Sequence, residues 1–145
     1  MKKILALFVA GIISLSAFSC FAEEYAEVKI NGETLEFDVP AQIIDGRTMV
    51  PMRKIFETFG ANVSWVESDE MIIANTTAGK IVIMKIGNPT LFIKKENEEV
   101  FNRVDFDVAP MIIDNRTLVP VRVVSESFGY EVDWDESTST VLINK

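Results

Sequence analysis

Apolar and polar residues alternate along most of the chain after residue 24, which is typical of half-buried β-strands. The first alternating segment covers 25–30, turns at Asn31-Gly32, a pair that favours a tight hairpin, and returns over 34–37. Further strands are expected at 41–44, 47–50, 63–65, 71–74, 80–86, 91–94, 132–134 and 140–143. The pattern therefore predicts a chain built mainly of antiparallel hairpins.

The apolar period changes from two residues to about 3.6 directly after Pro51. One face of a short helix would carry Met52, Ile55, Phe56 and Phe59. Gly60 suits the end of this helix because glycine readily adopts the left-handed conformation, and proline suits its first turn because the missing N–H would be unpaired there anyway. The same pattern between Pro120 and Gly129 predicts a second helix.

These two helices belong to an internal repeat, because the stretch at 43–53 recurs 69 positions later at 112–122. Roughly 19 of the 41 pairs between 35–75 and 104–144 are identical, where chance would give two or three. No linker rich in proline, glycine or serine separates the copies. We therefore expect an α+β fold in which two repeated units, at about 25–79 and 94–145, each curl antiparallel hairpins around one short helix and pack as one domain over 23–145.

Composition excludes several classes of function. The net charge of −8 opposes binding of nucleic acid and of anionic lipid. The chain has no histidine and one cysteine, so it lacks the usual ligands of a copper or zinc site, a Ser-His-Asp or Cys-His catalytic group, and an internal disulfide. We expect no metal, cofactor or catalytic residue.

The N-terminus has the features of a secretory signal peptide over 1–22. Two lysines precede an apolar run at 4–13 that is too short to span a membrane, and small residues lead to Ala22. Cys20 offers an alternative as a lipoprotein cysteine, although the bulky Phe18 is a poor lipidation signal. The sequence thus predicts a secreted or envelope-associated protein with no integral membrane span.

Four repeated arginines are candidate functional residues: Arg47, Arg53, Arg116 and Arg122. They could form two anion sites at the helix starts. The alternative that we favour is structural, with each arginine forming an ion pair that fixes hairpin to helix. Asp38, Asp107, Glu57 and Glu126 recur in step with the arginines and are the expected partners.

Trp65 and Trp134 occupy equivalent strand positions, where exposed indoles could stack on sugar rings. Duplicated tryptophans in an alternating strand are more often core residues, which is the interpretation we favour. An acidic cluster around Asp133 and Asp135 lacks the glycine and glutamate spacing of a calcium loop, and it is absent from the first copy. A solvated turn explains it better.

The repeated residues also carry a resemblance to a known family. The family signature places Asn-Gly before a Gly-Arg-Thr-Leu-Val-Pro-Leu-Arg stretch, followed by Leu-Gly-Ala and Val-x-Trp-Asp. It matches here at 31–32, 46–53, 59–61 and 63–66, and again at 115–122, 128–130 and 132–135. Departures are mild, such as Asn115 for glycine and Val66 for aspartate. The chain resembles the copper amine oxidase N-terminal domain-like, or stalk-domain, family of secreted bacterial proteins.

The resemblance implies an α+β domain that is a non-catalytic stalk in the oxidases, where copper and topaquinone belong to a separate catalytic region. It supplies structural motif residues only: Arg47, Pro51, Arg53, Gly60, Trp65, Arg116, Pro120, Arg122, Gly129 and Trp134. We therefore expect a non-enzymatic exported module that contacts a protein or a cell-wall component. Two alternatives are a carbohydrate-binding module that uses Trp65, Trp134, Tyr25 or Tyr130, and an enzyme that uses carboxylates alone.

Overall fold

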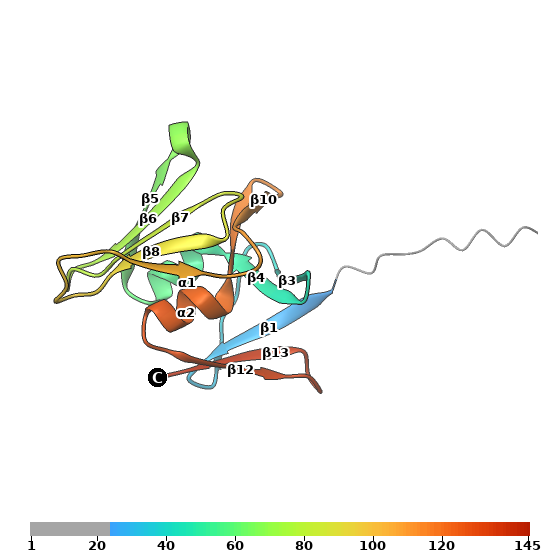
Figure 1. Cartoon of the computed structure of the whole chain (residues 1–145). Coiled ribbons are helices and arrows are strands. Elements are labelled where there is room, and N and C mark those ends of the chain that lie inside the picture. The colour runs from blue at the N-terminus through green and yellow to red at the C-terminus, as the bar shows by residue number, and fades with distance from the viewer. Residues whose placement is uncertain (1–23) are drawn as a thin grey trace, which may run out of the picture.

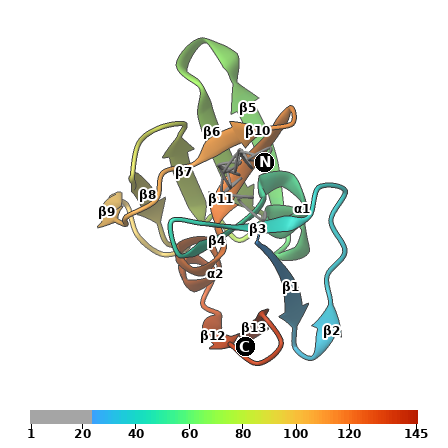
Figure 2. The ribbon, with the colours of Figure 1, turned by 90° about the vertical axis from the view of Figure 1, so that its right-hand side faces the viewer.

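The structure is a computed structural model that describes residues 24–145, so the expected signal peptide at 1–22 and Cys20 lie outside the described part. The fold is α+β (Figures 1 and 2). The strands are β1 (Tyr25–Ile30), β2 (Glu33–Thr34), β3 (Ala41–Ile44), β4 (Arg47–Pro51), β5 (Ala61–Val66), β6 (Met71–Thr76), β7 (Ile81–Lys85), β8 (Thr90–Lys94), β9 (Asn102–Asp105), β10 (Met111–Ile113), β11 (Arg116–Pro120), β12 (Glu131–Asp135) and β13 (Thr140–Asn144). The helices are α1 (Met52–Thr58), α2 (Val121–Ser127) and a 3₁₀ turn, η1 (Glu67–Asp69).

The strands form two sheets, and each sheet contains strands from both copies of the repeat. One sheet has the order β10-β11-β4-β3-β1-β13-β12, with β2 attached to β1. The other has the order β5-β6-β7-β8-β9. The copies are therefore interleaved in the described part of the chain rather than placed side by side.

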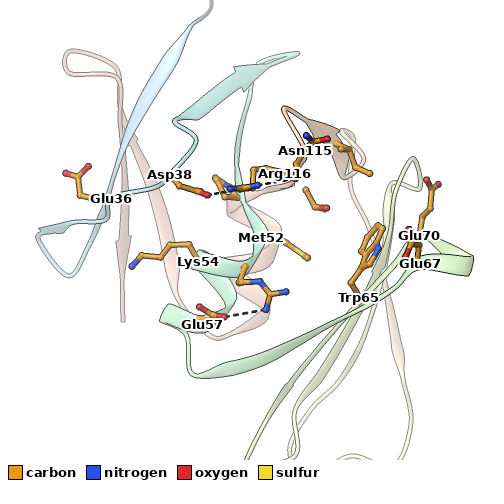
Figure 3. Close-up of a pocket in the computed structure, with 14 residues that line it drawn as sticks. Glu36, Asp38, Met52, Lys54, Glu57, Trp65, Glu67, Glu70, Asn115 and Arg116 are labelled. Atoms are coloured by element: carbon orange, nitrogen blue, oxygen red, sulfur yellow. Dashed lines mark hydrogen bonds and ion pairs between the residues drawn. The ribbon is translucent and has the colours of Figure 1, made fainter.

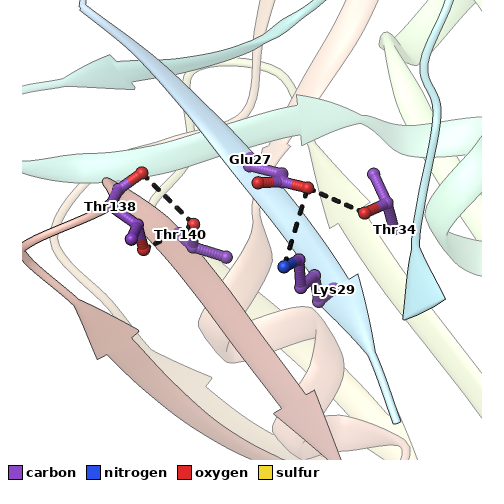
Figure 4. A network of polar contacts seen from close by, with 5 residues as sticks. All are labelled: Glu27, Lys29, Thr34, Thr138 and Thr140. Atoms are coloured by element: carbon purple, nitrogen blue, oxygen red, sulfur yellow. Dashed lines mark hydrogen bonds and ion pairs between the residues drawn. The ribbon is translucent and has the colours of Figure 1, made fainter. Parts of the chain in front are cut away.

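The first and last strands of the described chain are neighbours inside the larger sheet. β1 and β13 run parallel, with Val28 opposite Val141, while the other strand pairs are antiparallel. Side-chain hydrogen bonds also lie on either side of this junction: Thr34 of β2 donates one of 2.7 Å to Glu27 on β1, and Thr138 donates one of 2.9 Å to Thr140 at the start of β13 (Figure 4). The N-terminal strand of copy one is thus held by the C-terminal strand of copy two.

A pseudo-twofold axis passes between β4 and β11. Val50 lies opposite Val119, which is its own equivalent in the second copy, and Met49 lies opposite Pro120. Phe59 and Phe128, also equivalent to each other, stack with ring centroids 5.4 Å apart. The repeat in the sequence therefore appears as local symmetry in the structure.

The core lies between the sheets, where both helices bury their apolar faces. In Figure 1 the helices lie between the five-stranded sheet and the β12–β13–β1 part of the other sheet. Ile55 and Phe56 of α1 and Val124 of α2 are fully buried. A seven-residue helix is marginal alone, so this burial is what stabilises each helix.

Several details differ from the sequence-based expectation. β9 was not predicted, because its residues are mostly polar, and β2 is shorter than the expected return strand at 34–37. The hairpins of the two repeated units are divided between two sheets. Across 24–145, no helix combines the length and the apolar character needed to cross a membrane.

Candidate functional site

The register of β4 on β11 determines which residues meet at the surface. Because the two strands are antiparallel, the end of β4 lies beside the start of β11, with Pro51 opposite Leu118. Helix α1 begins directly after β4, so its first turn lies close to the hairpin turn that leads into β11. The symmetrical relation holds for α2 and the turn before β4. Two clefts form in this way, at opposite ends of the β4–β11 strand pair.

The larger cleft, here the α1 cleft, has a volume of about 940 Å³. Copy one contributes Pro51, Met52, Arg53 and Trp65, and copy two contributes Ile112, Asn115, Arg116 and Thr117. The remaining lining residues are charged: Glu36, Asp38, Lys54, Glu57, Glu67 and Glu70. Figure 3 shows Met52 and Trp65 facing each other across the cleft, with Glu67 and Glu70 beyond Trp65.

The smaller cleft, here the α2 cleft, has a volume of about 410 Å³. Copy two contributes Pro120, Val121, Arg122 and Trp134, and copy one contributes Ile43, Gly46, Arg47 and Thr48. Each of these residues is the repeat equivalent of one of the eight repeat residues in the α1 cleft. The α2 cleft is completed by Glu24, Val132, Asp133 and Val141.

Ion pairs between the copies border both clefts. Arg116 donates from Nε to Asp38 at 2.6 Å, and Arg47 lies 2.7 Å from Asp107 between Nη2 and Oδ2. The hydrogen bond from each arginine is the main reason that the pKa of Asp38 and of Asp107 lies below its usual value of 3.8. The residues expected as partners do pair, but they join one copy to the other rather than hairpin to helix.

The other two arginines pair within their own helices. Arg53 lies 3.6 Å from Glu57 and Arg122 lies 3.6 Å from Glu126, both at i,i+4 spacing. Arg122 also donates a 2.6 Å hydrogen bond to the carbonyl of Val132 on β12. Because all four guanidinium groups have partners, the arrangement does not favour the alternative of two vacant anion sites.

The tryptophans are more exposed than expected. Trp134 keeps 40 % of its surface accessible, so its interpretation as a core residue is wrong. Trp65 is half-buried and packs against the edge of the main core while it lines the α1 cleft. Strand alternation alone does not distinguish these sites, because one face of β12 meets solvent at the α2 cleft.

The four remaining motif residues set the ends of the helices. Pro51 and Pro120 are buried and directly precede α1 and α2, where a backbone N–H is not needed for helical pairing. Gly60 and Gly129 follow the helices with φ of +79° and +81°, in the left-handed region that favours glycine. The prolines therefore mark where each helix starts, and the glycines mark where it ends.

The clefts offer binding chemistry. Among the described residues, no group of three or more histidine, cysteine, aspartate or glutamate side chains could hold a metal ion. In the acidic turn of copy two, Asp135 accepts hydrogen bonds from the backbone N–H and the hydroxyl of Ser137, and the bond from the Ser137 side chain is the main cause of its lowered pKa. Indoles, guanidinium groups and carboxylates at the clefts suit recognition of a polar ligand.

Comparison with known proteins places this arrangement in a family. The family model of the copper amine oxidase N-terminal domain matches residues 29–143, which include both clefts except Glu24. Comparisons with curated proteins and with solved structures gave no match. In copper amine oxidases this N-terminal domain is non-catalytic. The chain therefore belongs to the copper amine oxidase N-terminal domain family.

Proposed function

We propose that this chain is a non-catalytic interaction module that is exported and acts in the cell envelope or in the extracellular space. It would bind a protein or a cell-wall component through the α1 and α2 clefts. The observation that carries the proposal is the duplication of one cleft, with the same eight lining positions, at both ends of the β4–β11 strand pair.

The chemistry of the clefts supports binding rather than turnover. Their arginines are held in ion pairs, and the family is that of a non-catalytic domain. A rigid, symmetrical scaffold with paired charges suits recognition, because ordered side chains lose little conformational entropy when a partner binds. The expected signal peptide at 1–22 supports export.

The test is a pull-down of purified residues 23–145 on isolated bacterial cell-wall sacculi, with and without secreted proteins from the same cells. Co-precipitation of a defined protein only when the secreted proteins are present would support a protein-binding module. Hydrolase or oxidase turnover by the purified chain would contradict a non-catalytic role. A variant with Trp134→Ala serves as the matched probe of the α2 cleft.

Carbohydrate or cell-wall glycan binding is a second candidate function. The exposure of Trp134, at 40 % of its surface in the α2 cleft, favours it, since an accessible indole can stack on the apolar face of a sugar ring. Retention on bare sacculi, without any added protein, would support this candidate over protein binding.

A further inference from the structure

We infer that the α1 and α2 clefts are two quasi-equivalent sites for the same class of ligand, an uncharged sugar chain, so that one protein molecule binds two ligand segments. This inference rests on the proposed function and names the ligand class of its clefts. Four observations carry the inference: the charge in each cleft, the indole on each wall, the hydrogen-bonding groups of the ion-paired side chains, and the size of each cleft.

A neutral ligand is the only charge class that is compatible with the lining charges of both clefts. The α1 cleft is lined by five carboxylates and three cationic side chains, which opposes an anion. The α2 cleft is balanced, with Arg47 and Arg122 against Glu24 and Asp133, so it gives no net attraction to a cation. A ligand that suits both members of a symmetrical pair is therefore polar and uncharged.

Each cleft has one tryptophan at the same repeat position. Trp65 faces Met52 across the α1 cleft (Figure 3), and Trp134 lies 40 % exposed in the α2 cleft. Sugar rings have apolar C–H faces, and an indole offers a large, rigid surface for them at a low entropic cost. An indole at the same position in both clefts thus favours a ring-shaped, weakly apolar ligand.

The ion-paired side chains can serve hydroxyl groups. Arg116 uses its Nε toward Asp38 and Nη1 toward the carbonyl of Asn115, and a guanidinium has five N–H donors in total. Arg47 repeats both contacts, with Asp107 and Gly46. Donors and acceptors held side by side match a sugar hydroxyl, which both donates and accepts.

The size of each cleft fits this class of ligand. Volumes of about 940 and 410 Å³ lie within the range of roughly 300–1,000 Å³ that is typical of small-molecule sites. The larger cleft would bind a longer segment of the sugar chain than the smaller cleft. We therefore expect two sites of unequal affinity, with the α1 cleft the tighter.

The experiment is isothermal titration calorimetry of purified residues 23–145 with two defined ligands, the β-1,4-linked tetramers of glucose and of N-acetylglucosamine, up to millimolar concentration. We expect at least one tetramer to bind at two sites per protein. Trp134→Ala should remove the weaker site and Trp65→Ala the tighter one, each with a loss of affinity of about tenfold or more at that site. Phe92→Ala is the matched control, because Phe92 is an aromatic side chain that is 41 % exposed and lies outside both clefts.

Folding of the variants is checked by circular dichroism, and Trp65→Phe replaces Trp65→Ala if the alanine variant unfolds. A phenyl ring keeps part of the stacking surface, so Trp65→Phe should reduce the affinity of the tighter site, but by less than complete removal of the aromatic ring. Binding of neither tetramer, a single site, or two sites indifferent to both tryptophan substitutions would overturn the inference. If the protein is retained on sacculi but binds neither tetramer, the sugar inference fails while the proposed interaction module stands. If the pull-down, with and without secreted proteins, and the calorimetry are all negative, the sugar inference and the proposed function both fail.

Discussion

Arg47 and Asp107 form an ion pair across the two copies of the repeat, with 2.7 Å between Nη2 and Oδ2. The reciprocal pair, Arg116 with Asp38, has 2.6 Å between Nε and Oδ2. Each copy therefore contributes one arginine and one aspartate, and each of these side chains pairs with a side chain of the other copy. Because the sheets are interleaved as well, we expect the two copies to fold together rather than as two units that fold and then dock.

The first prediction concerns this dependence. A fragment of residues 24–79 should remain unfolded alone, because it lacks β13, the parallel partner of β1, and β11, the partner of β4. It would also leave Val28 and Val50, both buried in the complete fold, without the strands that lie opposite them. Adding the fragment 80–145 should restore structure, as measured by far-ultraviolet circular dichroism. A fragment 24–79 that folds cooperatively without its complement would contradict the prediction.

The sequence predicted the elements of this fold better than their pairing. The repeat, the two helices and the turn glycines followed from local patterns, because apolar period and turn chemistry are local properties. The exchange of strands and ion pairs between copies could not be predicted, since an identical repeat arises whether Arg47 pairs with Asp38 in its own copy or with Asp107 in the other. Strand β9 was missed because Asn102 and Arg103 obscure any apolar alternation.

The same limit applies to the clefts. The tryptophans and arginines were identified as repeated positions, but a cleft that joins Trp65 of one copy to Arg116 of the other requires the β4–β11 register. The exposure of Trp134 was missed for a related reason. Its strand β12 lies at the edge of the larger sheet, and a sequence pattern does not indicate that position.

The second prediction is a dependence of stability on pH. The hydrogen bonds from Arg116 and Arg47 lower the pKa of Asp38 and Asp107 in the folded state below the value of 3.8. Both carboxylates thus favour the folded state above pH 3.8, and this contribution is lost as pH falls through their lowered pKa values. In urea titrations, the difference in unfolding free energy between wild type and the double variant Asp38→Asn/Asp107→Asn should shrink below about pH 4.

The control for this prediction is Glu33→Gln, which removes an exposed carboxylate that forms no ion pair in the described part of the chain. Because the paired side chains are about half exposed, high salt should also reduce the difference between wild type and the double variant. A difference that stays constant from neutral pH to pH 2 would show that these ion pairs do not couple to folding.

The third prediction concerns the end of α1. Gly60 has φ of +79°, and a Cβ atom there would meet no heavy atom within 4 Å apart from its chain neighbours, so the main cost of adding a Cβ is backbone strain. Gly60→Val should lower the free energy of unfolding by over about 1 kcal/mol, measured by urea denaturation. Gly60→Asn is the matched control, because asparagine tolerates the left-handed region and should cost less. Equal losses for both variants would point to a cause other than the backbone conformation.

The fourth prediction concerns packing between the copies. Phe56 of α1 is fully buried, and its ring meets Phe128 at a centroid distance of 5.7 Å in an edge-to-face arrangement. Phe56→Ala should reduce the free energy of unfolding by about 3–5 kcal/mol, because a large cavity would open between the two helices. Phe92→Ala, at a side chain 41 % exposed, should change it by less than about 0.5 kcal/mol. Similar effects of the two changes would contradict the position of Phe56 in the core.

The last prediction uses the fluorescence of the two tryptophans. Trp134 is 40 % exposed, whereas Trp65 keeps a smaller fraction of its surface accessible and packs against the main core. The two indoles should therefore differ in access to a neutral quencher. We expect acrylamide to quench the Trp65→Phe variant, which retains only Trp134, more strongly than the Trp134→Phe variant. Emission of the first variant should also lie at longer wavelength, because its indole meets water. If both indoles were protected and emitted at short wavelength, they would be core residues, and neither cleft would offer an aromatic surface to a ligand.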